Sequence, residues 1–405
     1  MSHVIIVGAG PAGASLAYLL ARRGIEVTLL ERQTDFEREF RGEGLMPSGV
    51  DAFAQMGLKA ELDALPYGHL AAAELYRNGR RLLRFNMPQD LTGSAGPRFI
   101  SQPEVLEMIV AQASRFPLFH MERGALAQDL IRENGRVAGV RLYSRDHPRE
   151  VRGDFVVGAD GRGSVLRRTS GLHEQRFPQG FDVVWCKVPM PPFFENGTLV
   201  RVYVGRGHFV FMFPAADGRV QVAWIIEKGT FGEIHRQGPE AWIADMCAHV
   251  SPDLAEHLRR CASQVTQPFL LNVVSDRLER WTAPGLLLIG DAAHPMSPVG
   301  AQGINIALRD ALVAANHLVP VLAAGASAPE IDAAAARVQQ KRLLEVSTIQ
   351  KLQERPPAIL FEKTMGSRLA LRLLPLLVRL GVAQRFAGSV VQRFAFGVSR
   401  VTLNV

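Results

Sequence analysis

The stretch Val4-Ile5-Ile6-Val7-Gly8-Ala9-Gly10-Pro11-Ala12-Gly13 decides the fold of this chain. Its four β-branched residues are typical of a buried parallel strand, and the apolar run at 14–21 predicts a helix directly after the glycines. The glycines match the pattern G-x-G-x-x-G. In that pattern Gly8 permits the tight turn, Gly10 lets the backbone approach a pyrophosphate, and Gly13 lets the helix lie close to the strand.

A second strand is predicted at 27–30, and it ends in Glu31 at about 20 residues after the glycines. A carboxylate there accepts hydrogen bonds from ribose hydroxyls and disfavours a 2′-phosphate, so the sequence predicts FAD or NAD rather than NADP. The helix N-terminus attracts the phosphate charge. A glycine-rich turn with no ligand is the alternative, and the order of strand, glycines, helix, strand and acid argues against it.

The composition is that of an ordinary globular protein. The 405 residues are 47% hydrophobic and 21% charged, which favours two or three domains. No apolar run approaches the roughly 18 residues of a membrane span, and the first strand starts too early for a signal peptide, so we expect a cytoplasmic protein. Cys186, Cys247 and Cys261 are far apart, which argues against a disulfide framework, a dithiol centre or a metal site.

The formal net charge of +7 belongs to the end of the chain. Residues 351–405 contain nine Lys and Arg against Glu354 and Glu362, whereas residues 1–350 carry 37 charges of each sign. The positive net charge therefore gives no indication that residues 1–350 bind nucleic acid. We expect the tail either to cap the first domain with helices or to lie on an anionic membrane surface.

Two later strands also end in an aspartate. The strand at 155–157 leads into Gly158-Ala159-Asp160-Gly161, and the strand at 286–289 leads into Gly290-Asp291-Ala292-Ala293-His294-Pro295. Parallel strands keep their ligand at their carboxyl ends, so both carboxylates are expected there, although Asp-Gly is also an ordinary turn. The backbone N–H groups near Gly303 open a helix whose positive end would stabilise a flavin that becomes anionic on reduction.

The residues between these motifs have a different character. Residues 180–226 predict a mostly antiparallel sheet, and turns at Asn78-Gly79 and Asn134-Gly135 predict hairpins. Three phenylalanines in 209–213 share one face, where they either wall an apolar pocket or pack in a core. Helices are expected at 105–116, at 239–260, from 303 to about 318, and at 333–353, the last stopped by Pro356-Pro357.

Taken together, the three motifs resemble single-component FAD-dependent aromatic monooxygenases, the class that includes para-hydroxybenzoate hydroxylase, ubiquinone-pathway hydroxylases and polyketide hydroxylases. The resemblance implies an α/β fold with a Rossmann-like FAD-binding domain and an inserted, mostly antiparallel substrate sheet. The expected domains are 1–70, 101–175 and 276–330 for FAD, 71–100 and 176–275 for the substrate, and 331–405 as a C-terminal helical region.

The resemblance also implies which residues hold the cofactor. Asp160 would serve both FAD and a transiently bound NAD(P)H, because the sequence has no second G-x-G-x-x-G. Pro298 corresponds to the proline beside the reactive flavin edge. The implied FAD contacts are Gly8, Gly10, Pro11, Ala12, Gly13, Glu31, Arg32, Arg41, Gln102, Asp160, Asp291, Gly300, Gly303, Ile304 and Asn305.

The implied reaction is oxygen transfer to a small molecule. NAD(P)H would reduce FAD, O2 would add to give a flavin C4a-hydroperoxide, and an apolar aromatic or quinone-like substrate would be hydroxylated or epoxidised. Arg201, Tyr203 and His208 are the catalytic candidates in the inserted sheet, beside Pro298. The alternatives are a flavin-dependent reductase of an isoprenoid or other double bond, which shares the Asp291 motif, and a non-catalytic flavin-binding redox protein.

Overall fold

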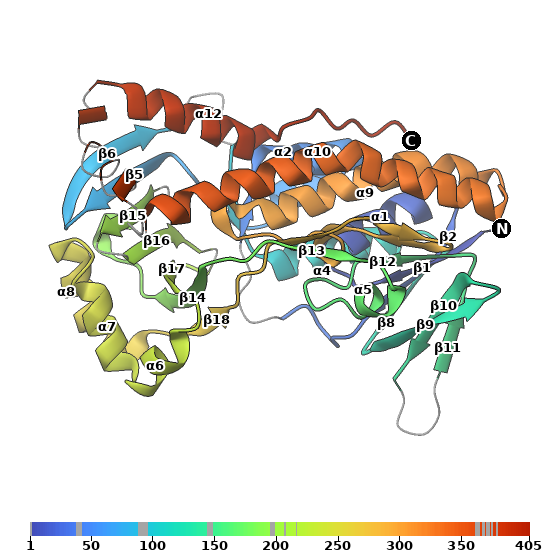
Figure 1. The fold of residues 1–405 in the computed structure, drawn as a ribbon, viewed down its shortest axis with the longest axis horizontal. Helices are drawn as coiled ribbons and strands as arrows, with labels where there is room; N and C mark the ends of the chain where they lie inside the picture. The colour runs from blue at the N-terminus through green and yellow to red at the C-terminus, as the bar shows by residue number, and fades with distance from the viewer. Residues whose placement is uncertain are drawn as a thin grey trace.

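A computed structural model of the chain describes residues 2–37, 43–87, 96–143, 149–194, 199–205, 208–215, 217–360, 365–366, 369, 373, 376–377 and 380–405. Two sheets lie beside each other, with long helices over one of them (Figure 1). The six-stranded sheet has the order β20 (Thr282–Ala283), β21 (Leu286–Leu288), β12 (Phe155–Gly158), β1 (His3–Val7), β2 (Glu26–Glu31) and β8 (Phe119–Arg123).

The core of the six-stranded sheet is the predicted one. β1 is buried from Val4 to Val7 and pairs in parallel with β2 on one side and β12 on the other. Helices cover one face of this sheet, and a three-stranded sheet lies on the other (Figure 1). The helices are α1 (Pro11–Arg22), α4 (Gln102–Ala113), α9 (Gln302–Ala323) and α10 (Ala328–Leu360), and the strands are β9 (Ala127–Glu133), β10 (Arg136–Leu142) and β11 (Arg149–Arg152).

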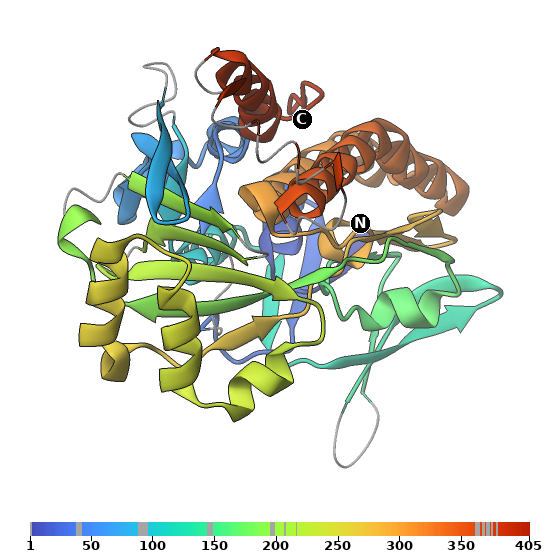
Figure 2. The ribbon, with the colours of Figure 1, turned by 60° about the vertical axis from the view of Figure 1, so that its left-hand side comes forward.

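The seven-stranded sheet is antiparallel except for one pair, as predicted for an inserted sheet. Its order is β18 (Phe269–Leu271), β14 (Phe181–Val188), β17 (Val220–Glu227), β16 (His208–Pro214), β15 (Leu199–Gly205), β5 (Ala72–Arg77) and β6 (Arg80–Asn86). One face packs on α6 (Phe231–Arg236), α7 (Pro239–Cys247) and α8 (Pro252–Arg260) (Figure 2). The other face is directed toward the six-stranded part of the molecule, because Phe99 and Val299 pack on it.

Short elements connect the two large sheets. β7 (Arg98–Ile100) pairs with both β3 (Gly44–Leu45) and β4 (Tyr67–His69). β13 (Glu174–Arg176) pairs with β19 (Asp276–Leu278) where the chain leaves the first domain and returns to it. The remaining helices are α2 (Pro47–Met56), α3 (Lys59–Ala64), α5 (Val165–Ser170) and α12 (Val382–Phe396). We keep the expected domain boundaries as a proposal that this strand pairing supports.

Two helix predictions were wrong in detail. The expected helix at 239–260 is two helices, α7 and α8, because Pro252 has no N–H to continue the ladder and Ser251 stands at the N-cap. The expected stop at Pro356-Pro357 does not occur, since α10 runs on to Leu360. A proline removes one hydrogen bond, which kinks a well-anchored helix without necessarily ending it.

Candidate functional site

The glycine-rich turn has the close contacts that its pattern predicts. Gly8 has a φ of +99°, and a Cβ there would stand 2.4 Å from the carbonyl oxygen of Ala159. A Cβ on Gly13 would stand 1.9 Å from the carbonyl oxygen of Gly8, so α1 can lie against β1 only without a side chain there. A Cβ on Gly10 would meet no atom within 4 Å. The turn is therefore tightly packed at Gly8 and Gly13, whereas its backbone is open to a ligand at Gly10.

The Glu31 carboxylate lies beside this turn at the end of β2. It is buried and accepts hydrogen bonds from the backbone N–H of Ala9, at 2.9 Å, and of Gln33, at 3.1 Å. Strand end, acid and helix N-terminus, with Pro11 and Ala12 in its first turn, thus meet at one edge of the sheet. The neighbouring Arg32 is exposed. Arg41 lies outside the described residues.

The Asp160 carboxylate has a local structural role. Ser164 Oγ donates to it at 2.5 Å, and the backbone N–H groups of Val165 and Leu166 donate to its other oxygen at 2.7 and 3.1 Å. Burial raises the pKa of this carboxyl despite these donors. The side chain holds the start of α5, and its expected contact with the two nucleotides stays a prediction.

Two arginines tie the Asp160 turn to the Asp291 turn. Arg162 Nε donates to the Asp291 carboxylate at 3.1 Å, and Arg167 Nη1 donates to the carbonyl oxygens of Asp291 and Ala292 at 3.1 and 3.0 Å. Because Gly8 also lies against Ala159, the three motifs converge although they are far apart in sequence. The sequence analysis did not single out Arg162, although it follows directly on Asp160-Gly161.

A buried carboxylate fixes the Asp291 turn from behind. Asp310, in α9, accepts hydrogen bonds from the backbone N–H of Gly290 at 3.0 Å and from His294 Nε2 at 2.7 Å. Arg342 Nε donates to its other oxygen at 2.7 Å. Sequence reasoning missed Asp310, because an acid inside an apolar helix carries no motif.

The loop before α9 is held in an unusual backbone conformation. Gly300 and Ala301 have positive φ angles of 74° and 52°. The Asn305 side chain donates to the carbonyl of Gly44 at 3.3 Å and accepts from the N–H of Met46 at 2.8 Å. Asn305 therefore joins this loop to the segment before α2.

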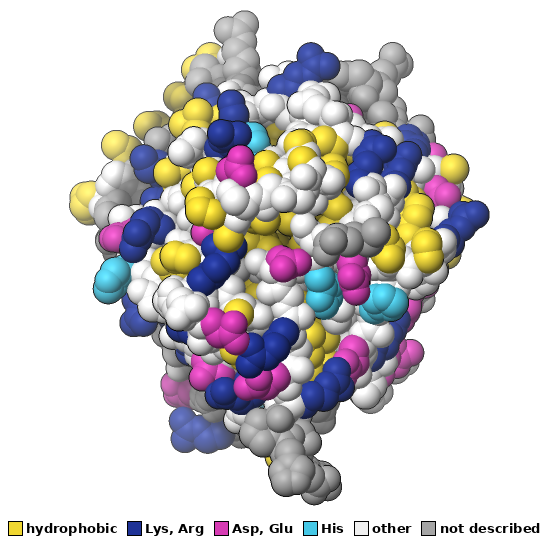
Figure 3. Space-filling model, turned by 90° about the vertical axis from the view of Figure 1, so that its right-hand side faces the viewer, with side chains coloured by type: hydrophobic (Ala, Val, Ile, Leu, Met, Phe, Trp, Pro, Cys, Tyr) yellow, Lys and Arg dark blue, Asp and Glu magenta, His cyan; other side chains and the backbone are white. Residues whose placement is uncertain are grey.

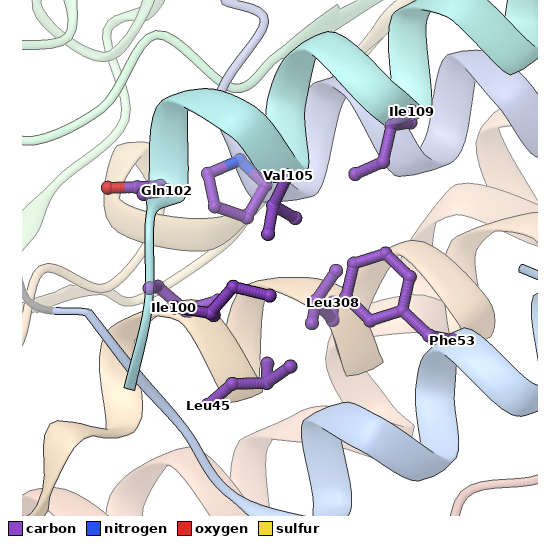
Figure 4. Close-up of a pocket in the computed structure, with 9 residues that line it drawn as sticks. Leu45, Phe53, Ile100, Gln102, Val105, Ile109 and Leu308 are labelled. Carbon is purple, nitrogen blue, oxygen red and sulfur yellow. The ribbon is translucent and has the colours of Figure 1, made fainter. Parts of the chain in front are cut away.

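The space around this loop is narrow and apolar. Figure 4 shows Ile100, Val105, Leu308, Phe53 and Leu45 around a cavity of about 10 Å³, with the Gln102 amide oxygen directed away from it. Pro11, Ile109 and Ile304 complete the lining. Its lining thus includes residues from the starts of α1 and α9, the two helix ends predicted to face the cofactor.

The seven-stranded sheet presents an aromatic wall toward this loop. We use the term aromatic wall for Phe209, Phe211, Phe213, Trp185 and Phe99. Phe99 and Phe213 are stacked with centroids 4.6 Å apart, and Phe211 and Phe213 lie 5.4 Å apart. Val299, next to Pro298, packs against the same cluster. The wall therefore lies next to the loop of the Gly290–Asn305 motif.

The sheet candidates for catalysis lie elsewhere. Arg201 and Tyr203 face α8 on the opposite side of the sheet, in the cluster around Trp224. Arg201 Nη1 donates to Asp253 at 2.8 Å and Arg201 Nε to Glu74 at 3.1 Å. The side chain of His208 lies outside the described residues. Arg201 and Tyr203 therefore pack on the face of the sheet opposite the aromatic wall, and their expected catalytic role stays a prediction.

A sequence profile described as "FAD binding domain" matches residues 1–342. The chain is also 30% identical over 396 residues to a 6-methylpretetramide 4-monooxygenase from Streptomyces rimosus, and the match covers 92% of this chain and 91% of that protein. The chain belongs to the FAD-dependent aromatic monooxygenases. The resemblance, the cofactor FAD and the class of oxidoreductase are therefore confirmed.

Solved structures share the fold of this monooxygenase. A p-nitrophenol 4-monooxygenase from Pseudomonas putida DLL-E4 matches with a TM-score of 0.79 at 18% identity, covering 99% of this chain and 100% of that chain. PqsL, a probable FAD-dependent monooxygenase from Pseudomonas aeruginosa, matches with a TM-score of 0.75 at 23% identity, covering 89% and 97%. At these identities the likeness concerns the fold alone.

The described residues of the monooxygenase fit FAD. Gly303, like Gly10, faces open space, because a Cβ there would meet no atom within 4 Å. The backbone at Gly10 and at Gly303 is therefore open to a close approach by the pyrophosphate and by the flavin, respectively. Glu31 at the strand end suits the ribose, and the N-terminus of α9 suits a ring that gains negative charge. These assignments, residue by residue, remain a proposal.

Proposed function

We propose that this monooxygenase uses NAD(P)H and O2 to hydroxylate or epoxidise an apolar polycyclic aromatic or quinone-like molecule. The observation that carries the substrate class is the aromatic wall, which lies next to the Pro298–Val299 loop. The relative from Streptomyces rimosus, named for its action on 6-methylpretetramide, supports the same class. Fused rings stack on aromatic side chains and bury large apolar areas there.

The side chains have separate tasks in this proposal. Bound FAD supplies the hydride acceptance and oxygen transfer. The N-terminus of α1 and Glu31 bind its adenosine diphosphate, and the loop held by Asn305 orients its ring. The aromatic wall excludes water from the reacting atoms, and Pro298 belongs to the loop whose Val299 packs against the wall.

Oxygen dependence tests the proposal. Purified FAD-loaded protein should consume NAD(P)H and O2 faster when a fused-ring phenol such as 1-naphthol is added, and labelled dioxygen should appear in the product. Product formation under nitrogen would instead identify a double-bond reductase. FAD binding with no turnover for any of a panel of phenols and quinols would identify a non-catalytic redox protein.

We also propose that the cytoplasmic enzyme touches anionic membranes through its C-terminal region. Met365, Leu369, Leu373, Leu376 and Leu380 recur at spacings of three and four residues and are 43–81% exposed. Residues 363–400 contain seven Lys and Arg and no Asp or Glu. An exposed apolar stripe within a basic segment fits an anionic lipid surface, where apolar aromatics also partition.

Vesicle sedimentation tests this contact. The full chain should bind vesicles of phosphatidylglycerol and lose binding when Leu369, Leu373 and Leu376 are replaced by Ser together. Vesicles of phosphatidylcholine should bind much less, because they lack the negative charge. Equal recovery of wild-type and substituted protein with anionic vesicles would contradict the proposal.

The rest of the molecule does not share this charge. On the face at the right-hand end of Figure 1, Lys and Arg side chains are interspersed with Asp and Glu side chains (Figure 3). The helix Val299–Ala323 is long and apolar enough to cross a membrane, but 72% of its most apolar 18-residue stretch is buried inside the protein. This helix is therefore a core element, and the proposed contact is peripheral.

A further inference from the structure

Gln221 is a buried amide in the seven-stranded sheet. It is the second residue of β17, an interior strand of the seven-stranded sheet, and has 0% of its surface exposed. Neither its Nε2 nor its Oε1 has a hydrogen-bond partner among the described residues. Buried polar groups in native proteins are nearly always paired, so an amide with both ends unpaired points to a missing partner.

Gln221 belongs to the face of the sheet that carries the aromatic wall. In the antiparallel register it is opposite Phe213 of β16 and Lys187 of β14, and opposite residues share one face. Phe213 is the ring that stacks on Phe99. The amide is therefore a polar group set among the rings that would bind a substrate.

The position is also close to the cofactor loops. Lys187 Nζ lies 3.7 Å from the carboxylate of Glu43, which directly precedes Gly44. Asn305 of α9 donates to the carbonyl of Gly44. The strand position opposite Gln221 thus touches the segment that Asn305 holds, so a ligand beside Gln221 lies near the proposed flavin site.

We propose that Gln221 is the residue that recognises the polar edge of the substrate. Its amide offers one donor side and one acceptor side, which match an aromatic ring bearing a hydroxyl next to a carbonyl. The proposal rests on the function proposed above and names its substrate class more closely. Gln221 has no exposed surface, so a ligand reaches its amide only when neighbouring side chains such as Phe213 move aside.

A pair of naphthyl ketones tests this recognition. We would titrate FAD-loaded protein with 1-hydroxy-2-acetonaphthone and with 2-acetonaphthone, following the flavin spectrum, and measure NAD(P)H oxidation with each. Wild type should bind the hydroxyketone about tenfold more tightly than the ketone, which corresponds to about 1.4 kcal/mol. Gln221→Leu should bind the two ketones equally and keep its affinity for FAD.

Two further measurements separate recognition from a structural role. The control Phe211→Leu should weaken the binding of both ketones to the same extent and keep the preference for the hydroxyketone. This substitution removes aromatic area but no polar group. The thermal midpoint of Gln221→Leu without ligand should equal or exceed that of wild type, since an apolar side chain replaces an unpaired amide. A lower midpoint with unchanged preference would assign Gln221 to a structural water and overturn the proposal.

The outcomes distinguish this inference from the proposed function. A wild type that turns over phenols, with Gln221→Leu keeping the full preference for the hydroxyketone, overturns the inference alone. A wild type that binds neither ketone overturns the substrate class. Absence of O2-dependent turnover with every phenol and quinol overturns the proposed function itself.

Discussion

Single glycines decide whether the phosphate turn forms and whether it binds. Gly13 is surrounded by backbone, with the Gly8 carbonyl oxygen 1.9 Å from where its Cβ would stand. Gly10 faces empty space at the N-terminus of α1. Gly13 is therefore required for packing, and Gly10 is the glycine that a ligand would approach. Substitutions at the two positions should have different effects.

Replacing each of these glycines with alanine should separate stability from binding. Gly13→Ala should lower the thermal midpoint of FAD-free protein by several degrees, because α1 must move away from β1. Gly10→Ala should leave that midpoint unchanged and lower the affinity for FAD at least tenfold, since its methyl group occupies the space proposed for pyrophosphate. Thermal unfolding and flavin fluorescence titration measure the two effects. Normal FAD affinity in Gly10→Ala would contradict the assignment.

Asp310 is the residue whose charge state matters most to the Asp291 turn. Burial alone raises the pKa of its carboxyl, but the positive charges of His294 and Arg342 outweigh this and lower the pKa to about 2. The unfolded chain has the ordinary pKa of about 3.9. Because the folded form binds the proton less tightly, this contribution to stability is complete above about pH 4 and is lost as the pH falls toward 2.

Asp310→Asn should therefore remove part of the acid sensitivity. The free energy of unfolding of wild type should exceed that of the variant at pH 5, and the excess should shrink by about 2 kcal/mol on going to pH 2. Urea unfolding at stepped pH measures it. Asp51→Asn, at an exposed site, serves as the control. A difference that stays constant with pH would refute the role given to Asp310.

At the scale of elements, the two faces of the seven-stranded sheet have different roles. One face packs Arg201, Tyr203 and Trp224 against α7 and α8, and the other presents the aromatic wall. Period-two alternation along β15 and β16 places neighbouring residues on opposite faces. A polar residue in these strands is therefore a site candidate only if its register places it on the wall side.

Tyr203→Phe should change stability and leave catalysis alone. Its hydroxyl receives a hydrogen bond from Arg201 at 3.3 Å and pairs with Ser251 at 3.0 Å. Loss of these contacts should lower the free energy of unfolding by about 1 kcal/mol. Steady-state kinetics with 1-naphthol should give kcat and KM within twofold of wild type, whereas Phe213→Leu on the wall should raise KM. A tenfold change in KM for Tyr203→Phe would contradict this prediction and support a role for Tyr203 in catalysis.

At the scale of the whole molecule, buried ion pairs and hydrogen bonds anchor the C-terminal segment to α9 and α10. Arg309 of α9 and Arg342 of α10 both pair with Glu345, and Arg309 also donates to the carbonyl of Ser399. The backbone N–H of Val398 donates to Glu345 at 2.9 Å. The last residues are thus connected, through Arg342 and Asp310, to the Asp291 turn.

Gly397→Ala should disturb this anchoring. Gly397 has a φ of +81°, and its Cβ would stand 1.7 Å from Arg309 Nη1. We expect the variant to lose more than about 1 kcal/mol of unfolding free energy, because alanine strains the backbone at this φ and its methyl group displaces Arg309. Gly388→Ala, within α12 and with no atom within 4 Å of its Cβ, should be neutral or stabilising. Equal unfolding midpoints in urea for the two variants would argue against this anchoring.

The sequence by itself determined the first domain and the cofactor. The G-x-G-x-x-G turn with Glu31 and the two aspartate turns each follow a predicted strand in a short, recognisable stretch of residues, so their positions at the sheet edge could be predicted. The hairpin turns at Asn78-Gly79 and Asn134-Gly135 were predictable for the same reason, and both have the positive φ angles that such turns need.

Only the tertiary structure decided which side chains face the site. Arg201 and Gln221 look alike as polar residues in predicted strands, yet one packs on α8 and the other lies on the wall side, because sheet order and helix placement choose the face. Asp310 gains its role only when α9 meets Arg342 of α10 and the Gly290 turn. These pairings join residues distant in sequence, so no local pattern encodes them.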